Sequence, residues 1–261
     1  MKLPATLALT GALFAAVAAP AWAGRLEDIQ ASGVLRVGIA LTGEPIGFRD
    51  ADNQPVGYDV VVANRLATAL GVKLQVTEVD GAARITMLQA GQIDVVIANL
   101  TATLERAKAV DFTIPYLKTG LKLLTRAGAG IKTLQDLAGK KVIVGRGTTG
   151  ETLVKREAPT AQLVYTETFA PQAILLLRQQ RAEAAIEDSS LIDFAAKQNP
   201  GLVSLAESYT SDAEALGVKK GDPEFLRFLD MFVSMYISSG AYQANYQHWF
   251  GTPGPALTSL W

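Results

Sequence analysis

The sequence contains no cysteine and only one histidine. Without cysteine the chain can form no disulfide, thiolate nucleophile or cysteine-ligated metal site, so a hydrophobic core must hold the fold. The single histidine, His248, is expected to pack at the surface. No serine–histidine–aspartate set, metal-ligand spacing or Walker motif is evident. We therefore expect neither a metal nor a cofactor.

An excess of charge of either sign is also missing. The chain has 24 basic and 25 acidic residues. Without Lys2, which lies in the predicted signal, the balance is 23 − 25 = −2. This balance favours neither nucleic acid nor an anionic membrane surface as a partner. Beyond the first 23 residues no run is long and apolar enough to cross a bilayer.

Residues 1–23 have the pattern of a cleaved secretory signal. Lys2 provides the positive start, Leu7 to Ala19 is apolar but too short to span a bilayer, and Ala21–Ala23 is a small-x-small cleavage site. We expect a periplasmic mature chain of 261 − 23 = 238 residues that begins at Gly24. No twin arginine is present, and no cysteine follows for a lipid anchor.

Predicted strands alternate with predicted helices in two successive sets, which is typical of right-handed crossovers and parallel sheets. Extended crossings near Tyr116–Gly120 and Asp212–Leu216 separate the sets. We therefore predict an α/β fold of two lobes, each a mostly parallel sheet flanked by helices, joined by two hinge strands around a cleft. The expected boundaries are 24–117 for the first part of lobe 1, 118–213 for lobe 2, and 214–261 for the return to lobe 1.

The stretch 93–106 combines a buried strand with a helix start. Thr103 is expected to cap that helix, which puts Arg106 in the first turn, where the partly positive helix end disfavours a cation. An anion bound by Arg106, Thr101 and free backbone N–H groups would offset this cost. The carboxyl end of a parallel strand is where open α/β sheets bind ligands. The alternative is a solvated Arg106 beside Glu105.

Gly145–Gly150 matches G-x-G-x-x-G between a predicted strand and a predicted helix. The pattern alone would indicate dinucleotide binding, with Glu167 placed to read a ribose. However, a lobe of about ninety residues is roughly half of such a fold. We favour an anion-binding turn formed by Thr148, Thr149 and backbone N–H groups at the helix start. The alternative is a turn that merely needs glycine.

Two further charged residues lie at strand ends. Arg84 also sits at a predicted helix start, so it and Arg106 suggest one anionic ligand, unless they are unrelated surface residues. Asp188 follows Glu187 at the end of a predicted strand. It could pair with an ammonium group across a cleft, or it could simply cap the next helix.

Taken together, these motifs resemble the bacterial extracellular solute-binding proteins of family 3, the amino-acid receptors of ABC importers. Arg84–Ile85 and Trp249–Phe250 are similar to the glutamate/aspartate-binding branch in particular. The resemblance covers essentially the whole mature chain and rests, in order, on Val34–Gly38, Val56–Val60, Leu88–Asp94, Thr103–Arg106, Val110–Tyr116, Asp136–Val142, Gly147–Thr149 and His248–Gly251.

The resemblance implies a grip on both charged ends of an amino acid. Arg106 would bind the α-carboxylate, assisted by Thr101 and the backbone at Asn99. Thr149 would donate to the same carboxylate from lobe 2, and Asp188 would pair with the α-amino group.

The side-chain end of the implied pocket departs from the family. Ala40 stands where relatives often carry a charged residue, and Gly81 stands where many carry an aromatic one. Arg84 occupies the position at which receptors for acidic side chains place a cation. With Arg146 nearby, we predict a polar or acidic amino acid as the ligand.

The implied function is capture of a free amino acid by hinge closure and delivery to an ABC transporter permease. The protein would be monomeric and would have no enzyme activity. One alternative is an enzyme similar to cyclohexadienyl dehydratases, with Glu187 as a general acid, although an amine-pairing Asp188 argues against it. The other is an exported dinucleotide-binding domain built on 145–150.

Overall fold

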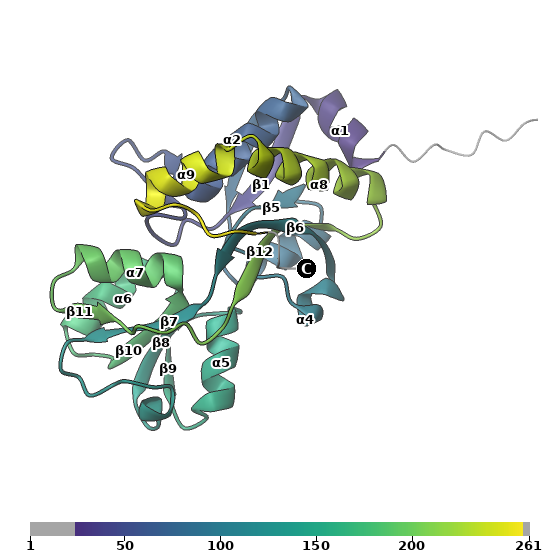
Figure 1. Ribbon diagram of the computed structural model, residues 1–261. Coiled ribbons are helices and arrows are strands. Elements are labelled where there is room, and N and C mark those ends of the chain that lie inside the picture. Colours follow the sequence, from purple (N-terminus) through teal and green to yellow (C-terminus); the bar gives the residue numbers. More distant parts are fainter. Residues whose placement is uncertain (1–23, 258–261) are drawn as a thin grey trace, which may run out of the picture.

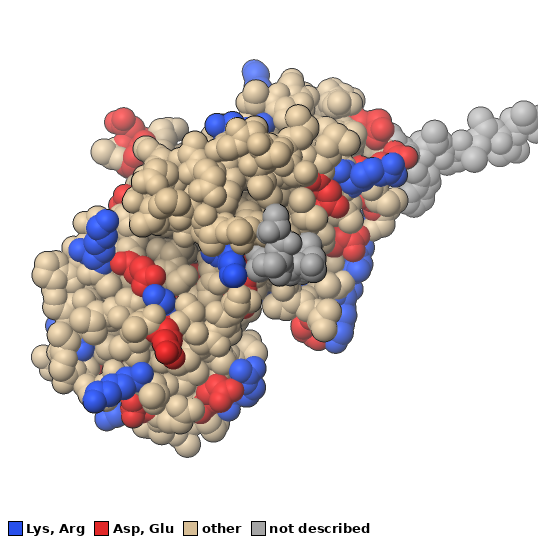
Figure 2. Space-filling model, in the orientation of Figure 1, with Lys and Arg blue, Asp and Glu red and all other residues tan. Residues whose placement is uncertain are grey.

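The computed structural model describes residues 24–257 and shows two α/β lobes, one above the other in Figure 1. The predicted signal sequence, 1–23, lies outside the described residues. No helix in the described part is long and apolar enough to cross a membrane. On the face shown in Figure 2, basic and acidic side chains are interspersed over both lobes.

Lobe 1 contains a five-stranded sheet in the order β4-β1-β5-β12-β6. Strand β1 is parallel to β4 and β5, whereas β12 is antiparallel to β5 and β6. The N-terminal elements of this lobe are α1 (Arg25–Ser32), β1 (Val34–Ile39), β2 (Phe48–Arg49), β3 (Pro55–Val56), α2 (Tyr58–Leu70), β4 (Lys73–Glu78), α3 (Ala83–Gln89), β5 (Val95–Val96), α4 (Leu104–Ala107) and β6 (Val110–Thr119). Its C-terminal elements are β12 (Asp212–Lys219), α8 (Pro223–Ser238) and α9 (Ala241–Phe250).

Lobe 2 contains a second five-stranded sheet, in the order β11-β7-β10-β8-β9. Strand β8 is parallel to β10 and β9, whereas β7 is antiparallel to β10 and β11. The elements are β7 (Leu121–Arg126), the short 3-10 helix η1 (Gln135–Leu137), β8 (Lys141–Gly145), α5 (Thr149–Glu157), β9 (Gln162–Thr166), α6 (Phe169–Arg178), β10 (Ala184–Asp188), α7 (Ser189–Gln198) and β11 (Leu202–Ser204).

The predicted α/β fold of two lobes is confirmed, but each sheet is mixed rather than mostly parallel. The antiparallel pairings come from the strands that connect the lobes. Strand β6 runs into β7 with only Gly120 between them, and β12 returns alongside β6 in the opposite direction. The chain therefore enters lobe 2 through β7 and leaves it toward β12, and both strands run against their neighbours.

Helices α8 and α9 cross lobe 1 in Figure 1, and the C-terminal end of α9 lies next to α7 of lobe 2. Asp222 caps α8 by accepting a hydrogen bond from the Phe225 backbone N–H at 2.9 Å, and Pro223 occupies its first turn. The apolar face of α8 then packs into the core of lobe 1, with Phe225 and Leu229 almost fully buried. Separate apolar clusters fill lobe 2. Each lobe thus has its own core, and Leu191 of lobe 2 packs against the core of lobe 1.

Candidate functional site

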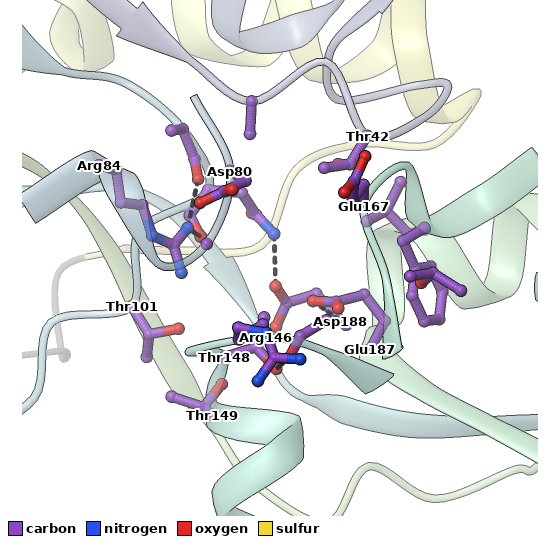
Figure 3. A pocket seen from close by; sticks show the side chains of 18 of the residues that line it. Thr42, Asp80, Arg84, Thr101, Arg146, Thr148, Thr149, Glu167, Glu187 and Asp188 are labelled. Atoms are coloured by element: carbon purple, nitrogen blue, oxygen red, sulfur yellow. Dashed lines mark hydrogen bonds between the residues drawn. The ribbon is translucent and has the colours of Figure 1, made fainter. Parts of the chain in front are cut away.

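A cavity of about 310 Å³ lies between the lobes and is lined by eight residues of lobe 1 and eleven of lobe 2. Six of the seven residues singled out from the sequence line it, as Figure 3 shows for those that it labels. These six are Arg84, Asn99, Thr101, Thr148, Thr149 and Asp188. The seventh, Arg106, is not among the lining residues. Segments far apart in the sequence therefore meet at one small polar cavity.

Asn99 and Asp188 form a direct contact between the lobes. The Asn99 side-chain amide donates a hydrogen bond to one oxygen of the Asp188 carboxylate. The other oxygen accepts a bond from the Thr119 hydroxyl at 3.3 Å. Asp188 stands at the N-cap position of α7, but its side chain makes no capping hydrogen bond. The capping alternative is therefore wrong, and the buried carboxylate faces the cavity.

Asp59 holds Asn99 in place from within lobe 1. Its place before an apolar helical run suggests a helix cap, but it lies in the first turn of α2, which follows Gly57. Its fully buried carboxylate accepts hydrogen bonds from the Asn99 backbone N–H at 2.9 Å and from the Tyr116 hydroxyl at 2.7 Å. Asn99 has a positive φ of 46°, a conformation that asparagine adopts more readily than most residues, and the bond holds this backbone in place beside the cavity.

We predict that Asp59 makes the protein less stable as the pH rises. Burial raises the pKa of Asp59 from 3.8 to about 7. The folded protein therefore holds this proton more tightly than the unfolded chain does. The stabilisation, about 4 kcal/mol at most, is complete below pH 3.8 and is lost as the pH rises through about 7.

Urea unfolding of ligand-free protein between pH 4 and pH 8 checks this prediction. The unfolding free energy should decline with pH, and Asp59→Asn, which cannot ionise, should show a shallower decline. Asp52→Asn, at an exposed turn, is the control and should keep the slope of the unaltered protein. Equal slopes for all three proteins would contradict the role given to Asp59.

Arg84 presents a fixed cation at the wall of the cavity. It is only 6% exposed, which excludes the alternative of a surface arginine. Its Nη1 donates to the backbone carbonyls of Ala98 at 2.8 Å and Asn99 at 3.3 Å. Its buried Nε has no hydrogen-bond partner among the described residues. This nitrogen is shielded from the cavity, so only the rest of the guanidinium can face a ligand.

Arg106 connects the lobes just outside the cavity. The Thr103 hydroxyl accepts a hydrogen bond from the Arg106 backbone N–H at 3.2 Å, so the predicted cap of α4 is confirmed. The guanidinium donates to the Thr101 carbonyl at 2.7 Å and, across the cleft, to the Gly147 carbonyl at 3.1 Å. Burial lowers its pKa to about 10, so it stays charged at neutral pH. Its contact with a ligand carboxylate remains a prediction.

The glycine-rich turn 145–150 is partly filled by the chain itself. The Thr148 hydroxyl caps α5 by accepting from the Glu151 N–H at 3.2 Å, and it donates to the Gly145 carbonyl at 2.9 Å. The Glu151 carboxylate accepts from the Gly147 N–H at 2.6 Å. Thr148 therefore uses its hydroxyl structurally, whereas no bond within the described protein occupies that of Thr149. A carboxylate in the turn also argues against a pyrophosphate there.

Glu214 is a buried carboxylate of the site that the sequence reasoning missed. It is completely buried on β12, and one carboxyl oxygen lies 3.2 Å from the Thr101 hydroxyl and 2.9 Å from the Thr119 hydroxyl, whose single proton Glu214 and Asp188 share. Burial raises its pKa well above the usual range. The available signal was an acidic residue inside a strand of small apolar residues. Glu214 orients the Thr101 hydroxyl from behind the cavity wall.

Lobe 2 adds further residues to the cavity wall, and two of them, Arg146 and Glu187, had already been suggested by the sequence. Glu187 lies beside Asp188, and Phe169 lies at the start of α6. Burial raises the pKa of both the Glu187 and the Asp188 carboxyl, and a nearby carboxylate adds to each rise. Arg146 lies over the Tyr165 ring, with the guanidinium carbon 4.0 Å from its centroid. The cavity thus combines cations, carboxylates and aromatic walls.

Two α/β lobes joined by paired strands, with a cavity of mixed charge between them, define a protein that can hold a small polar solute. The family model for bacterial extracellular solute-binding proteins, family 3, matches residues 35–252. The chain belongs to this family, which confirms the resemblance drawn from the motifs.

Named relatives agree with the family. The L-cystine-binding protein TcyJ of Escherichia coli (strain K12) is 32% identical over 233 residues, covering 87% of this chain and 86% of TcyJ. The ABC transporter glutamine-binding protein GlnH of Bacillus subtilis (strain 168) is 31% identical over 197 residues, covering 74% and 72%. Cyclohexadienyl dehydratase of Pseudomonas aeruginosa is 27% identical over 246 residues, covering 91% and 90%.

Solved structures confirm the two-lobe fold of the periplasmic amino-acid-binding type. The crystal structure of the P235GK mutant of ArgBP from T. maritima superposes with a TM-score of 0.83 at 31% identity. The match covers 87% of this chain and 100% of that one. The same architecture thus carries transport binding proteins and, in one named relative, an enzyme.

Proposed function

We propose that this protein is a periplasmic receptor that binds a free amino acid between its lobes and delivers it to an ABC transporter permease. The observation that carries the proposal is that the buried Asp188 carboxylate of lobe 2 and the buried Arg84 guanidinium of lobe 1 line the same small cavity. An amino acid carries charges of both signs, so it can interact with the carboxylate and with the guanidinium at the same time. Its family membership and the relatives named for cystine and glutamine support the same class of ligand.

The proposed orientation uses groups from both lobes. The ligand ammonium pairs with Asp188 of lobe 2. The ligand α-carboxylate accepts from Thr101 of lobe 1 and Thr149 of lobe 2, with Arg106 beside it. Arg106 exchanges its carbonyl partners for the stronger charged acceptor when the ligand enters.

Capture then follows from a shift in the hinge population. A ligand that touches both lobes binds the closed form better than the open form, so it moves the equilibrium toward closure. We propose that the hinge lies where β6 and β12 meet lobe 2, near the predicted lobe boundaries 117/118 and 213/214. The closed, loaded protein is the form presented to the permease, and we propose that it acts as a monomer.

The ligand proposed here is a polar or acidic amino acid. The Arg84 guanidinium at the cavity wall can donate to an oxygen atom of the ligand side chain, and Arg146 adds a second cation to the wall. Glu187 is a carboxyl on the same wall, and its raised pKa favours the protonated form. A protonated Glu187 can donate to a side-chain oxygen, so it does not oppose Arg84.

Thermal unfolding of the mature protein against the standard amino acids and small dicarboxylates tests the proposal. A ligand at a thousandfold its Kd should add about 4 kcal/mol, or roughly ten degrees. A shift confined to glutamate, aspartate or polar analogues supports Arg84 as the selector. A shift with basic amino acids only would support the receptor function but exclude Arg84 as the residue that selects the ligand. No shift with any amino acid would contradict the proposed function.

A second candidate function is dehydration of a cyclohexadienyl substrate. Glu187 favours it, because a buried carboxyl with a raised pKa beside a cavity is suited to general-acid chemistry. The relative named cyclohexadienyl dehydratase is compatible with it. Incubation with prephenate and arogenate, followed by detection of aromatic product, decides the question. Turnover by the unaltered protein that is lost in Glu187→Gln would show that the protein is an enzyme and not a receptor.

A further inference from the structure

Two glycines of lobe 1 touch lobe 2 directly, at two separate places beside the cavity. Gly81 precedes α3 and meets the turn between β8 and α5. Gly43 lies in the loop after β1 and meets the start of α6. At both places the two lobes approach each other with almost no side chain between them.

The contact at Gly81 is with the backbone of lobe 2. A Cβ atom at Gly81 would lie 2.5 Å from the carbonyl oxygen of Arg146 and 3.3 Å from the Thr148 methyl group. The φ angle of Gly81 lies outside the left-handed region, so its conformation alone does not require glycine. A backbone carbonyl cannot swing away as a flexible side chain can. Because many relatives are expected to carry an aromatic residue at this position, the need for glycine arises from the close approach of the lobes in this chain.

The contact at Gly43 is with a side chain of lobe 2. A Cβ atom at Gly43 would lie 2.5 Å from the Cβ atom of Ala170. The Ala170 backbone N–H donates a hydrogen bond to the carbonyl of Thr42 at 3.0 Å, which joins the two lobes at the same point. Thr42 itself lines the cavity. At this second place, too, the backbones of the two lobes therefore contact each other directly.

We propose that Gly43 and Gly81 set how far the cleft closes, an inference that rests on the proposed function. Asn99 of lobe 1 reaches Asp188 of lobe 2, and Arg106 reaches the Gly147 carbonyl, only when the lobes are this close. A side chain at either glycine holds the lobes apart, so that ligand groups of opposite lobes no longer reach one amino acid. Gly81 is thus a point of contact between lobes as well as an opening in the pocket wall.

Gly81→Ala is the cleaner variant. Its clash exists only in the closed form, so we expect unchanged urea unfolding without ligand. The Kd for the amino acid that binds the unaltered protein should rise at least about tenfold in calorimetry. An unchanged Kd would overturn the inference and leave the proposed function standing.

Gly43→Ala has a reciprocal control. We expect weaker binding in the single variant and recovery to within about threefold in Gly43→Ala/Ala170→Gly, because the second change removes the opposing Cβ atom. Any strain of alanine at the Gly43 φ of 155° affects open and closed forms alike and cancels from Kd. Ala170→Gly alone corrects for the altered helix start. A double variant as weak as the single one would count against the contact.

A distance measurement separates this inference from the identity of the ligand. The chain has no cysteine, so two introduced cysteines, Ala69→Cys on α2 and Arg156→Cys on α5, are the only sites that spin labels can react with. Both positions are exposed, and they lie in different lobes. Pulsed EPR without and with amino acids should show a short-distance population that Gly81→Ala removes. A short-distance population that persists in Gly81→Ala, or its absence from the unaltered protein under all conditions, would overturn the inference. Absence of binding to any amino acid would separately refute the proposed function.

Discussion

Replacing Arg106 by alanine is expected to weaken amino-acid binding about a thousandfold. The change removes the predicted partner of the ligand α-carboxylate, which in the loaded form replaces the Gly147 carbonyl as acceptor. Loss of the charged partner of a ligand carboxylate costs several kcal/mol, and about 4 kcal/mol corresponds to this factor. Titration calorimetry with the amino acid found by thermal unfolding gives the ratio.

Two further variants make the Arg106 result specific. Arg106→Lys keeps the charge but lacks the planar fork that serves two acceptors, so it should recover only part of the affinity. Arg65→Ala, at an exposed position of α2, should bind like the unaltered protein. An Arg106→Ala variant within threefold of the original Kd would show that the guanidinium only supports the closed form weakly and does not hold the ligand.

Replacing Asp188 by asparagine is expected to weaken amino acids at least about thirtyfold while changing little for analogues that lack the ammonium group. Asparagine has nearly the same shape, so it mainly removes the negative charge opposite the ammonium. The Kd values of an amino acid and of its des-amino analogue, measured for both proteins, give the comparison.

The matched control for Asp188 is Asp193→Asn, farther along α7. Its carboxylate pairs with Lys122 at 3.0 Å, is half exposed and lies away from the cavity, so neither ligand should be affected. Equal losses for the amino acid and its des-amino analogue in Asp188→Asn would sink the assignment of Asp188 to the ammonium group. Asp188 would then act through its bond to Asn99.

The sequence predicted the two-lobe plan because alternation of strands and helices is a local pattern that the chain order preserves. It also predicted the cap at Thr103, which depends on residues only three positions apart. The mixed sheets were missed because pairing of β12 with β6 joins segments about one hundred residues apart. Periodicity within a segment carries no information on its neighbours in the sheet.

The residues of the candidate site also fall into those that local sequence patterns predict and those whose positions depend on distant parts of the chain. The residues at strand ends, Arg84, Asn99 and Asp188, could be expected at the cavity because strand ends share one edge of a sheet. The position of the Arg106 guanidinium could not, since it depends on the Gly147 carbonyl of the other lobe. Glu214 was missed because the hydroxyl that it orients, at Thr101, lies 113 positions away in the sequence.

Which of the two hydroxyls, Thr148 or Thr149, caps α5 could also be determined only from the structure. Adjacent hydroxyls at a helix start look alike in the sequence, and only the capping geometry decides which one faces inward. The Thr148 hydroxyl caps α5 and bonds to Gly145, so Thr149 is left for a ligand. The Glu151 carboxylate accepts a hydrogen bond from the Gly147 N–H, where a phosphate-binding turn would leave this N–H for the ligand. The glycine-rich motif here therefore caps a helix and does not bind a phosphate.

The most direct test of the central claim is the distance between lobes during a ligand titration. Protein labelled at positions 69 and 156 is titrated with the amino acid that gives the largest thermal shift, and pulsed EPR follows the distance distribution. We predict a short-distance population that grows with ligand and reaches half its final size at the Kd found by calorimetry. Saturable binding with an unchanged distance distribution would contradict capture between the two lobes.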